Sequence, residues 1–191
     1  MAPPRYKIPI SALVVVYTPD LSVLLIERAD FPGHWQSVTG SLEGGETLAA
    51  TATRELREET GIDAGRYGGV VDWGMTNVFD IYPKWQWRYA PGTTQNTEHV
   101  FGLPVPGQVS VALAPREHLR HVWLPWREAA ARCFSWTNRD AIEALPARVA
   151  ASTGSTAGTV SPPSFSPSSP APSLPHRSPR TRPCPRRRSS R

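Results

Sequence analysis

Three glutamates, Glu55, Glu58 and Glu59, fall within five consecutive residues of the stretch GSLEGGETLAATATRELREETGI, which spans positions 40–62. Like charges this close weaken a helix by roughly a few tenths of a kcal/mol per pair. Carboxylates at such spacing can bind a divalent cation or transfer protons, and a bound cation would relieve the repulsion. The element that carries the three side chains decides which of them can do so.

The segment Thr47–Thr60 is predicted to be a helix, because it is rich in Ala, Leu, Arg and Glu and Gly61 follows it. A helix advances about 100° per residue, so Glu55 and Glu59 fall within about 20° of Leu48, at the margin of the apolar stripe. Partly buried carboxylates need compensation. Mg²⁺ prefers oxygen ligands and is typically held by a few carboxylates together with substrate phosphates. This geometry favours a metal site at the two glutamates.

A solvated, salt-bridged helix face is the alternative interpretation. Arg54 and Glu58 are spaced i, i+4 and can pair, and Arg57 points about 180° away from Leu48. This interpretation accounts for Arg57 and Glu58, but it leaves the two carboxylates at the margin of the buried face unexplained.

Nine positions between 40 and 62 resemble the signature of the Nudix hydrolases, G-x5-E-x7-R-E-U-x-E-E-x-G-U, in which U is apolar. The matching residues are Gly40, Glu46, Arg54, Glu55, Leu56, Glu58, Glu59, Gly61 and Ile62. The resemblance implies an α/β fold of the Nudix type, an α/β/α sandwich with a mixed β-sheet. It also implies hydrolysis of a nucleoside diphosphate linked to another group, with Mg²⁺ or Mn²⁺ as the cofactor.

The same resemblance implies roles within this Nudix motif. Glu55 and Glu59 would bind the metal, Glu58 would lie close by as a further ligand or a base, and Arg54 would hold one of these glutamates in place. The expected catalytic residues are therefore Glu58, Glu59 and Arg54. The metal would neutralise phosphate charge and activate water, and a carboxylate would accept the proton.

Five segments, most of them outside the motif, resemble the family of bacterial dihydroneopterin triphosphate diphosphatases: YKIPISALVVVY, WQSVTGSLEGGET, RYAPGTTQNTEH, EHLRHVWL and FSWTNRDAIE. The similarity runs from about Tyr6 to Leu145 and implies conversion of 7,8-dihydroneopterin triphosphate to the monophosphate and pyrophosphate in folate biosynthesis. It also implies that Glu117 is a third metal ligand. The substrate-binding residues that it implies are Lys7, Arg28, Thr39, Phe79, Asp80, Ile81, Tyr82 and Ser135.

Taken alone, each of these residues has an ordinary structural explanation. Arg28 could be a solvated strand end, Glu117 a loop carboxylate and Ser135 a helix N-cap. An aromatic residue of FDIYP, at 79–83, could stack on a pterin, or the segment could simply pack as a strand. The histidines His34, His99, His118 and His121 have no ligand spacing, so they are expected to be structural or solvent-facing.

Two other functions are compatible with the sequence. A nucleoside triphosphate pyrophosphohydrolase that sanitises the nucleotide pool would use the same chemistry on another substrate. A non-catalytic protein with a Nudix fold could instead bind nucleic acid through an Arg-rich C-terminal segment. The intact glutamates of the motif argue against that second alternative.

The elements that must position these residues alternate between strands and helices. Apolar, β-branched runs predict a β-hairpin at Ile10–Tyr17 and Val23–Arg28. Pro146 should end the last helix, and Trp85 and Trp87, which alternate with polar residues, should pack in the core. Further strands are predicted at Gly69–Met75, Lys84–Tyr89, Thr97–Val105 and His118–Leu124, and helices near Trp126–Cys133 and Trp136–Ala147.

The composition changes near position 150, which predicts a Nudix hydrolase domain at 1–150 and a tail at 151–191. The tail holds eleven Ser, nine Pro and seven Arg and lacks Asp, Glu, Lys, Trp and Tyr, so we expect it to be disordered. The formal net charge of +5 divides into +7 for the tail and −2 for the domain. The domain therefore has no excess of positive charge for nucleic acid.

The remaining signals concern the compartment. Cys133 and Cys184 provide neither a disulfide framework nor a metal-ligand spacing. The N-terminus, MAPPRYKIPI, has no apolar signal core, and no apolar run reaches the length of a membrane span. The sequence therefore predicts a cytoplasmic enzyme with a small-molecule pterin or nucleotide triphosphate as its substrate and no membrane partner.

Overall fold

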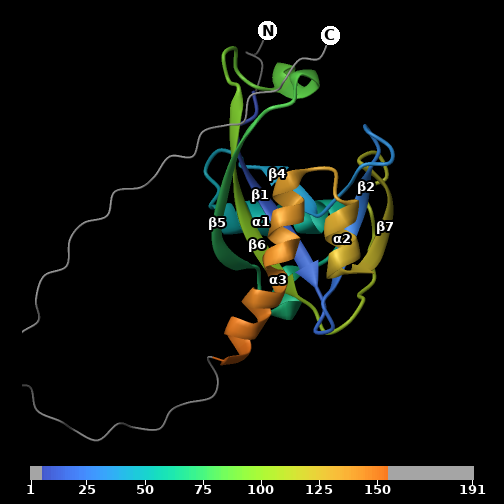
Figure 1. The fold of residues 1–191 in the computed structure, drawn as a ribbon. Helices are drawn as coiled ribbons and strands as arrows, with labels where there is room; N and C mark the ends of the chain where they lie inside the picture. The colour runs from blue at the N-terminus through green and yellow to red at the C-terminus, as the bar shows by residue number, and fades with distance from the viewer. Residues whose placement is uncertain (1–5, 155–191) are drawn as a thin grey trace, which may run out of the picture. The chain divides into compact units, whose positions relative to one another are not determined.

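The structure, a computed structural model, describes residues 6–154. Seven strands form one mixed sheet (Figure 1). The strands are β1 (Ile10–Tyr17), β2 (Ser22–Arg28), β3 (Trp35–Gln36), β4 (Val38–Ser41), β5 (Val71–Asp80), β6 (Gln95–Pro104) and β7 (His118–Pro125). The helices are α1 (Leu48–Thr60), α2 (Trp126–Arg132) and α3 (Trp136–Gly154), with short 3-10 helices η1 (Ala64–Tyr67) and η2 (Pro83–Arg88).

Strand β1 connects the two parts of the sheet. It pairs antiparallel with β2 and β4 and parallel with β6. Strand β2 also pairs with β3 and β7, and β6 pairs with β5. Tyr17 of β1 lies opposite Val23 of β2, which confirms the predicted hairpin.

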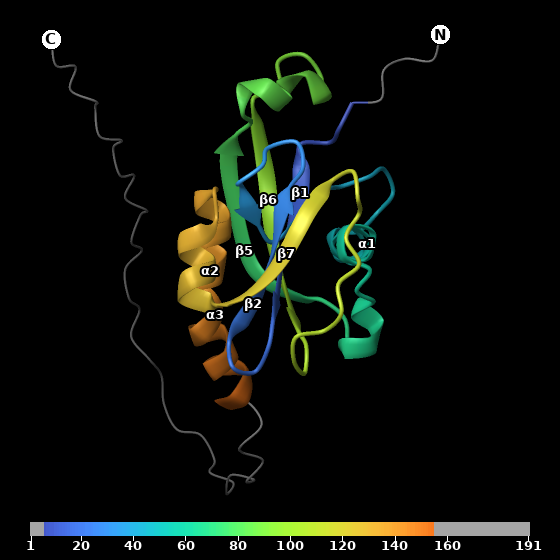
Figure 2. The same cartoon turned by 90° about the vertical axis from the view of Figure 1, so that its right-hand side faces the viewer.

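Helices cover both faces of the sheet, with α1 on one side and α2 and α3 on the other (Figure 2). Successive side chains of a strand point to opposite faces, and β1 is buried on both. Its Val14 packs in one core with Leu56 of α1, and its Leu13 packs in the other core with Leu145 of α3. The predicted α/β/α sandwich with a mixed sheet is confirmed.

Helix α1 begins one residue later than predicted, because Thr47 is its N-cap, and it ends at Thr60 as predicted. The hydroxyl of Thr47 accepts a hydrogen bond from the backbone N–H of Ala50 at 3.2 Å and caps the first turn. Gly61 ends the helix in the left-handed region, with φ of 69°, and its N–H donates to the carbonyl of Arg57. Both ends of the helix that carries the glutamates are therefore fixed by local interactions.

The predicted strand at Lys84–Tyr89 is wrong, because this segment is the 3-10 helix η2. Pro83 occupies its first turn, where the fixed φ of proline favours a helical start. A period of three residues no longer places Trp85 and Trp87 on one face. Trp87 is 74% exposed and Trp85 is half-buried, so the expectation that both pack in the core is also wrong.

The prediction that Pro146 ends the last helix is wrong as well, since α3 continues through it to Gly154. Contacts beyond the proline hold this second half against the sheet. Arg148 donates a hydrogen bond to the carbonyl of Trp73, and its guanidinium lies 5.4 Å from the centre of the Trp73 ring. Val149 packs against the same core as Leu145.

Strand β5 extends beyond the predicted Gly69–Met75 to Asp80, so Phe79 and Asp80 are strand residues and Ile81 and Tyr82 follow the strand.

Most of the predicted tail at 151–191, namely residues 155–191, lies outside the described residues. Within residues 6–154, no helix has both the length and the apolar character needed to cross a membrane.

Candidate active site

A cavity of about 800 Å³ is lined by residues of β1, β4, β6, α1, η2 and the loop before α3. It brings together every predicted metal ligand and every predicted substrate-binding residue: Lys7, Arg28, Thr39, Glu55, Glu59, Phe79, Asp80, Ile81, Tyr82, Glu117 and Ser135. Of the three expected catalytic residues, only Glu59 lines this cavity. Arg54 and Glu58 lie on the adjacent surface of α1.

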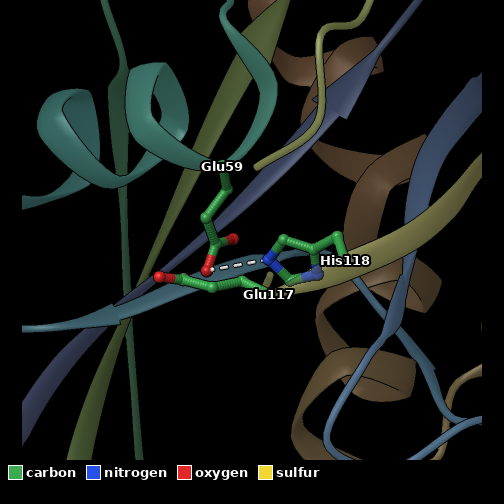
Figure 3. Close-up of side chains that lie close together, drawn as sticks. All are labelled: Glu59, Glu117 and His118. Atoms are coloured by element: carbon green, nitrogen blue, oxygen red, sulfur yellow. Dashed lines mark ion pairs between the residues drawn. The ribbon is translucent and has the colours of Figure 1, made fainter. Parts of the chain in front are cut away.

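Three side chains, Glu59, Glu117 and His118, converge in this cavity, and each offers a ligand atom within 4.8 Å of the other two (Figure 3). Glu59 comes from the last turn of α1, whereas His118 is the first residue of β7 and Glu117 immediately precedes that strand. Nε2 of His118 is 3.2 Å from Oε1 of Glu59. The backbone N–H of Thr39 donates to Oε2 of Glu59 at 3.3 Å.

This cluster fits a divalent cation. Burial raises the pKa of Glu59, while His118 and the N–H of Thr39 oppose that effect and the nearby charge of Glu117 adds to it. Both ring nitrogens of His118 are buried without a hydrogen bond of standard geometry, although Nε2 lies within ion-pair distance of Glu59. Two converging carboxylates beside an unsatisfied imidazole would gain from a cation, and the carboxylate oxygens suit Mg²⁺.

Glu55, a predicted metal ligand, lies outside this three-residue cluster but lines the same cavity. Burial raises the pKa of its carboxyl to about 7, and the guanidinium of Arg54 opposes the rise. The close approach of Gly40 to Glu55 explains the glycine of the motif. A Cβ at Gly40 would lie 1.7 Å from Cδ of Glu55, so a larger residue would displace the carboxylate.

Arg54 organises the outer side of the motif. Its Nε donates to Oε1 of Glu46 at 2.7 Å, and its Nη1 donates to Glu55 at 2.8 Å and Glu58 at 3.1 Å. Its Nη2 also donates to the carbonyl of Ser41 in β4. The bonds from Arg54 to Glu46, together with hydrogen bonds from the Thr51 hydroxyl and the Glu43 backbone, lower the pKa of Glu46 to about 2. The arginine thus holds the loop before α1 and the side chain of Glu55 in fixed positions.

Arg28, which pairs with His118 across β2 and β7, is fixed by its neighbours. Its Nε and Nη2 donate to the two carboxylate oxygens of Asp30 at 2.8 and 2.9 Å, and its Nη1 donates to Gln36 at 3.0 Å. The guanidinium lies 4.7 Å from the centre of the Trp85 ring. A cation and an aromatic face are therefore presented together to the cavity.

Ser135 has the structural role that its position allows as well as a place in the cavity wall. Its hydroxyl accepts hydrogen bonds from the backbone N–H and the side-chain amide of Asn138 at 3.3 and 2.9 Å. Oδ1 of Asn138 in turn accepts from the backbone N–H of Ser37 at 2.7 Å. This network ties the start of α3 to the segment between β3 and β4.

The lining residues that the sequence analysis missed include His118, Trp85 and Glu98. His118 directly follows Glu117, and this adjacency is a signal that could have placed it in the site. Trp85 was assigned to the core because its segment was taken for a strand. Glu98 is only 4% exposed on β6, and nothing in its local sequence indicates burial.

The NUDIX domain model matches residues 7–145 of the chain. The chain belongs to the NUDIX family. Members of this family generally use divalent metal ions, which agrees with the cluster around Glu59.

Several individual members of the family are similar to this chain over most of their length. The dihydroneopterin triphosphate diphosphatase of Escherichia coli K12 is 45% identical over 140 residues, which cover 72% of this chain and 92% of that protein. The Haemophilus influenzae enzyme of the same name is 38% identical over 73% of this chain and 88% of that protein. The solved structure of the E. coli dihydroneopterin triphosphate pyrophosphohydrolase matches with a TM-score of 0.68, over 72% of this chain and 94% of that one.

Proposed function

We propose that this NUDIX hydrolase is a Mg²⁺-dependent pyrophosphohydrolase that converts 7,8-dihydroneopterin triphosphate to dihydroneopterin monophosphate and pyrophosphate. The observation that carries the proposal is the 45% identity to the E. coli diphosphatase over nearly the whole of that protein. The family match also spans every residue that lines the cavity. The volume of the cavity, about 800 Å³, lies within the range of small-molecule sites.

In this proposal the acidic end of the cavity holds the metal and the reacting phosphates. Glu59 and Glu117, with Glu55 on the same wall, supply the carboxylates, and His118 orients Glu59. A bound divalent cation would neutralise phosphate charge and activate water. Glu58 is 59% exposed, lies outside the cavity lining and pairs with Arg54, so we assign it a positioning role.

The remaining walls bind the rest of the substrate. Lys7 and Arg28 supply positive charge for the triphosphate, and Thr39 and Ser135 supply hydroxyl groups. The segment from Phe79 to Tyr82 encloses the ring, with Ile81 buried and Tyr82 at the open edge, 44% exposed. The Tyr82 ring lies edge-on to Trp85, with 5.3 Å between the ring centres, so these two aromatic groups form one wall.

A substrate panel tests the proposed function. Initial rates with Mg²⁺ are measured for dihydroneopterin triphosphate, the four common dNTPs and an oxidised dGTP, and pyrophosphate is identified as the product. We expect kcat/KM for dihydroneopterin triphosphate to exceed the others by roughly 10²-fold or more, because a site built around one ring rejects others strongly. A higher kcat/KM for a dNTP would support the pool-sanitising alternative instead.

The metal requirement is tested on the same preparation. Chelation with EDTA should abolish turnover, and Mg²⁺ added in excess should restore it. Mn²⁺ is the matched comparison, because it accepts the same oxygen ligands. Turnover that persists after exhaustive chelation would contradict the proposed use of the carboxylates.

A further inference from the structure

The cavity wall contains a buried carboxyl group that no step above uses. Glu98 lies on β6, paired in parallel register with Ser11 of β1 and antiparallel with Asn77 of β5. The residue is 4% exposed, and its Oε1 has no hydrogen-bond partner. Within residues 6–154, no lysine, arginine or histidine forms an ion pair with it.

A carboxyl left in this state is unfavourable for the free protein. Burial raises the pKa of Glu98 to about 7, and the neighbouring Thr137 and Asn77 side chains only partly oppose it. The amide nitrogen of Asn77 makes no hydrogen bond of standard geometry, so its effect on the carboxyl is weak. A buried acceptor without a donor is destabilising, and such groups are rare in native proteins.

A second unsatisfied acceptor lies two residues away. The side chain of Asn96 points to the same face of β6 as Glu98, because side chains alternate along a strand. Its Nδ2 donates to the hydroxyl of Ser11 at 2.7 Å, which fixes the orientation of the amide. The buried Oδ1 is therefore left without a donor. Both residues are among those that line the cavity, and the two unpaired oxygens are buried in its wall.

These acceptors specify the chemistry of their ligand. Two oxygen acceptors with no neighbouring cation call for a neutral group that carries N–H donors. A flat 2-amino-4-oxopyrimidine ring presents an exocyclic amino group and a ring N–H side by side along one edge. A charge-assisted hydrogen bond from such an edge is stronger than one between neutral partners.

We propose that Glu98, supported by Asn96, recognises the 2-amino-4-oxopyrimidine edge of the substrate's heterocycle. This inference rests on the proposed function, since dihydroneopterin carries that edge, and guanine is the other source of the same chemistry. Glu98 is then a specificity-determining residue that binds the heterocycle, whereas the carboxylates around Glu59 hold the metal. Asn96 contributes a further acceptor for a ring or amino N–H.

The test compares the wild-type chain with Glu98→Gln and with Glu143→Gln, an equal change at an exposed glutamate of α3. Values of kcat/KM with Mg²⁺ are measured for dihydroneopterin triphosphate, GTP and ITP. GTP carries the edge, whereas ITP lacks only the 2-amino group. A neutral amide of the same size removes the buried charge, so thermal unfolding should show that Glu98→Gln is folded.

We expect Glu98→Gln to lower kcat/KM for dihydroneopterin triphosphate and GTP by about ten- to a hundredfold, as for a lost hydrogen bond to a charged group. The value for ITP should change by less than about threefold, because its contact with the carboxylate is already incomplete. Glu143→Gln should match the wild type on all three. Equal losses on the three substrates, or no loss on the first two, would overturn the inference.

The same kcat/KM measurements distinguish failure of the proposed function from failure of this inference. A wild-type chain that prefers GTP to dihydroneopterin triphosphate contradicts the proposed substrate. In that case, selective loss of GTP turnover in Glu98→Gln still supports recognition of the edge, with guanine as its source. Unselective loss contradicts both proposals.

Discussion

At the scale of single residues, the site places three carboxyl groups where burial raises their pKa: Glu55, Glu59 and Glu98. Each differs in what surrounds it. Glu55 faces Arg54, Glu59 faces His118 and Glu117, and Glu98 faces only neutral polar groups. Burial of a carboxylate opposes folding unless a cation or donor compensates it, which supports the proposal that these residues bind a cation or a ligand donor.

The substitution Glu59→Gln should separate catalysis from stability. The amide keeps the size of the side chain but removes a negative charge from the cation cluster, so kcat with Mg²⁺ should fall by roughly 10²-fold or more. The midpoint of thermal unfolding should not fall, because burial already disfavours the charged form of Glu59. Turnover near the wild-type value at saturating Mg²⁺ would show that Glu59 is not a metal ligand.

A second prediction concerns Glu98 and pH. The folded pKa, about 7, lies above the ordinary value of 4.5, so this group contributes stability below about pH 4.5 that is lost as the pH rises through 7. Glu98→Gln does not titrate. The unfolding free energy of the variant minus that of the wild type should therefore increase from pH 5 to pH 8, as measured by urea denaturation without ligand. A difference that stays constant would mean that the carboxyl is not desolvated.

At the scale of elements, α1 and its loop are specified locally. The Thr47 cap, the Gly61 stop and the bonds of Arg54 to Glu46, Glu55 and Glu58 all lie within a short stretch of chain. The helix can therefore be predicted from the sequence alone. Gly40 belongs to the same unit, because only a residue without a Cβ leaves room for Glu55.

Other elements depend on contacts that the local sequence does not show. Alternation of aromatic and polar residues predicts a strand at Lys84–Tyr89, but Pro83 starts a 3-10 helix there. His118 of β7 contacts Glu59 of α1, and the two residues are distant in sequence. Glu98 is buried by the strands on either side and by Thr137 of α3. Such placements follow from tertiary packing, which periodicity cannot report.

Helix α3 provides a test of the difference between local preference and packing. Pro146 lacks the N–H that would bond to the carbonyl of Ile142, which destabilises a helix interior by about 3 kcal/mol. Pro146→Ala should therefore raise the unfolding free energy. The gain should be only about 1–2 kcal/mol, because alanine gives the unfolded chain more freedom, and this opposes folding. Differential scanning calorimetry measures the change. A lower melting temperature would mean that the helix is kinked there and packs through the proline ring.

At the scale of the whole molecule, the described residues 6–154 contain every group assigned to the site. Helix α3 reaches Gly154, so a deletion should begin after that residue rather than at 151. A chain that ends at Gly154 should keep kcat/KM for dihydroneopterin triphosphate within about twofold of the full chain, because no assigned site residue is removed. A larger loss, with an unchanged melting temperature, would show that residues 155–191 contribute to catalysis.

Because β1 pairs with β6, the site can form only after β6 has been synthesised. Most of the cation-binding motif is synthesised early, but β6, Glu117 and Ser135 come much later, and the bond between Ser37 and Asn138 spans 101 residues. Closing such long loops is what slows the folding of non-local topologies. A nascent chain that has only reached β5 therefore carries the glutamates of the NUDIX motif but lacks the rest of the proposed site. Activity appears only when the last third of the domain has been made and joined to the first.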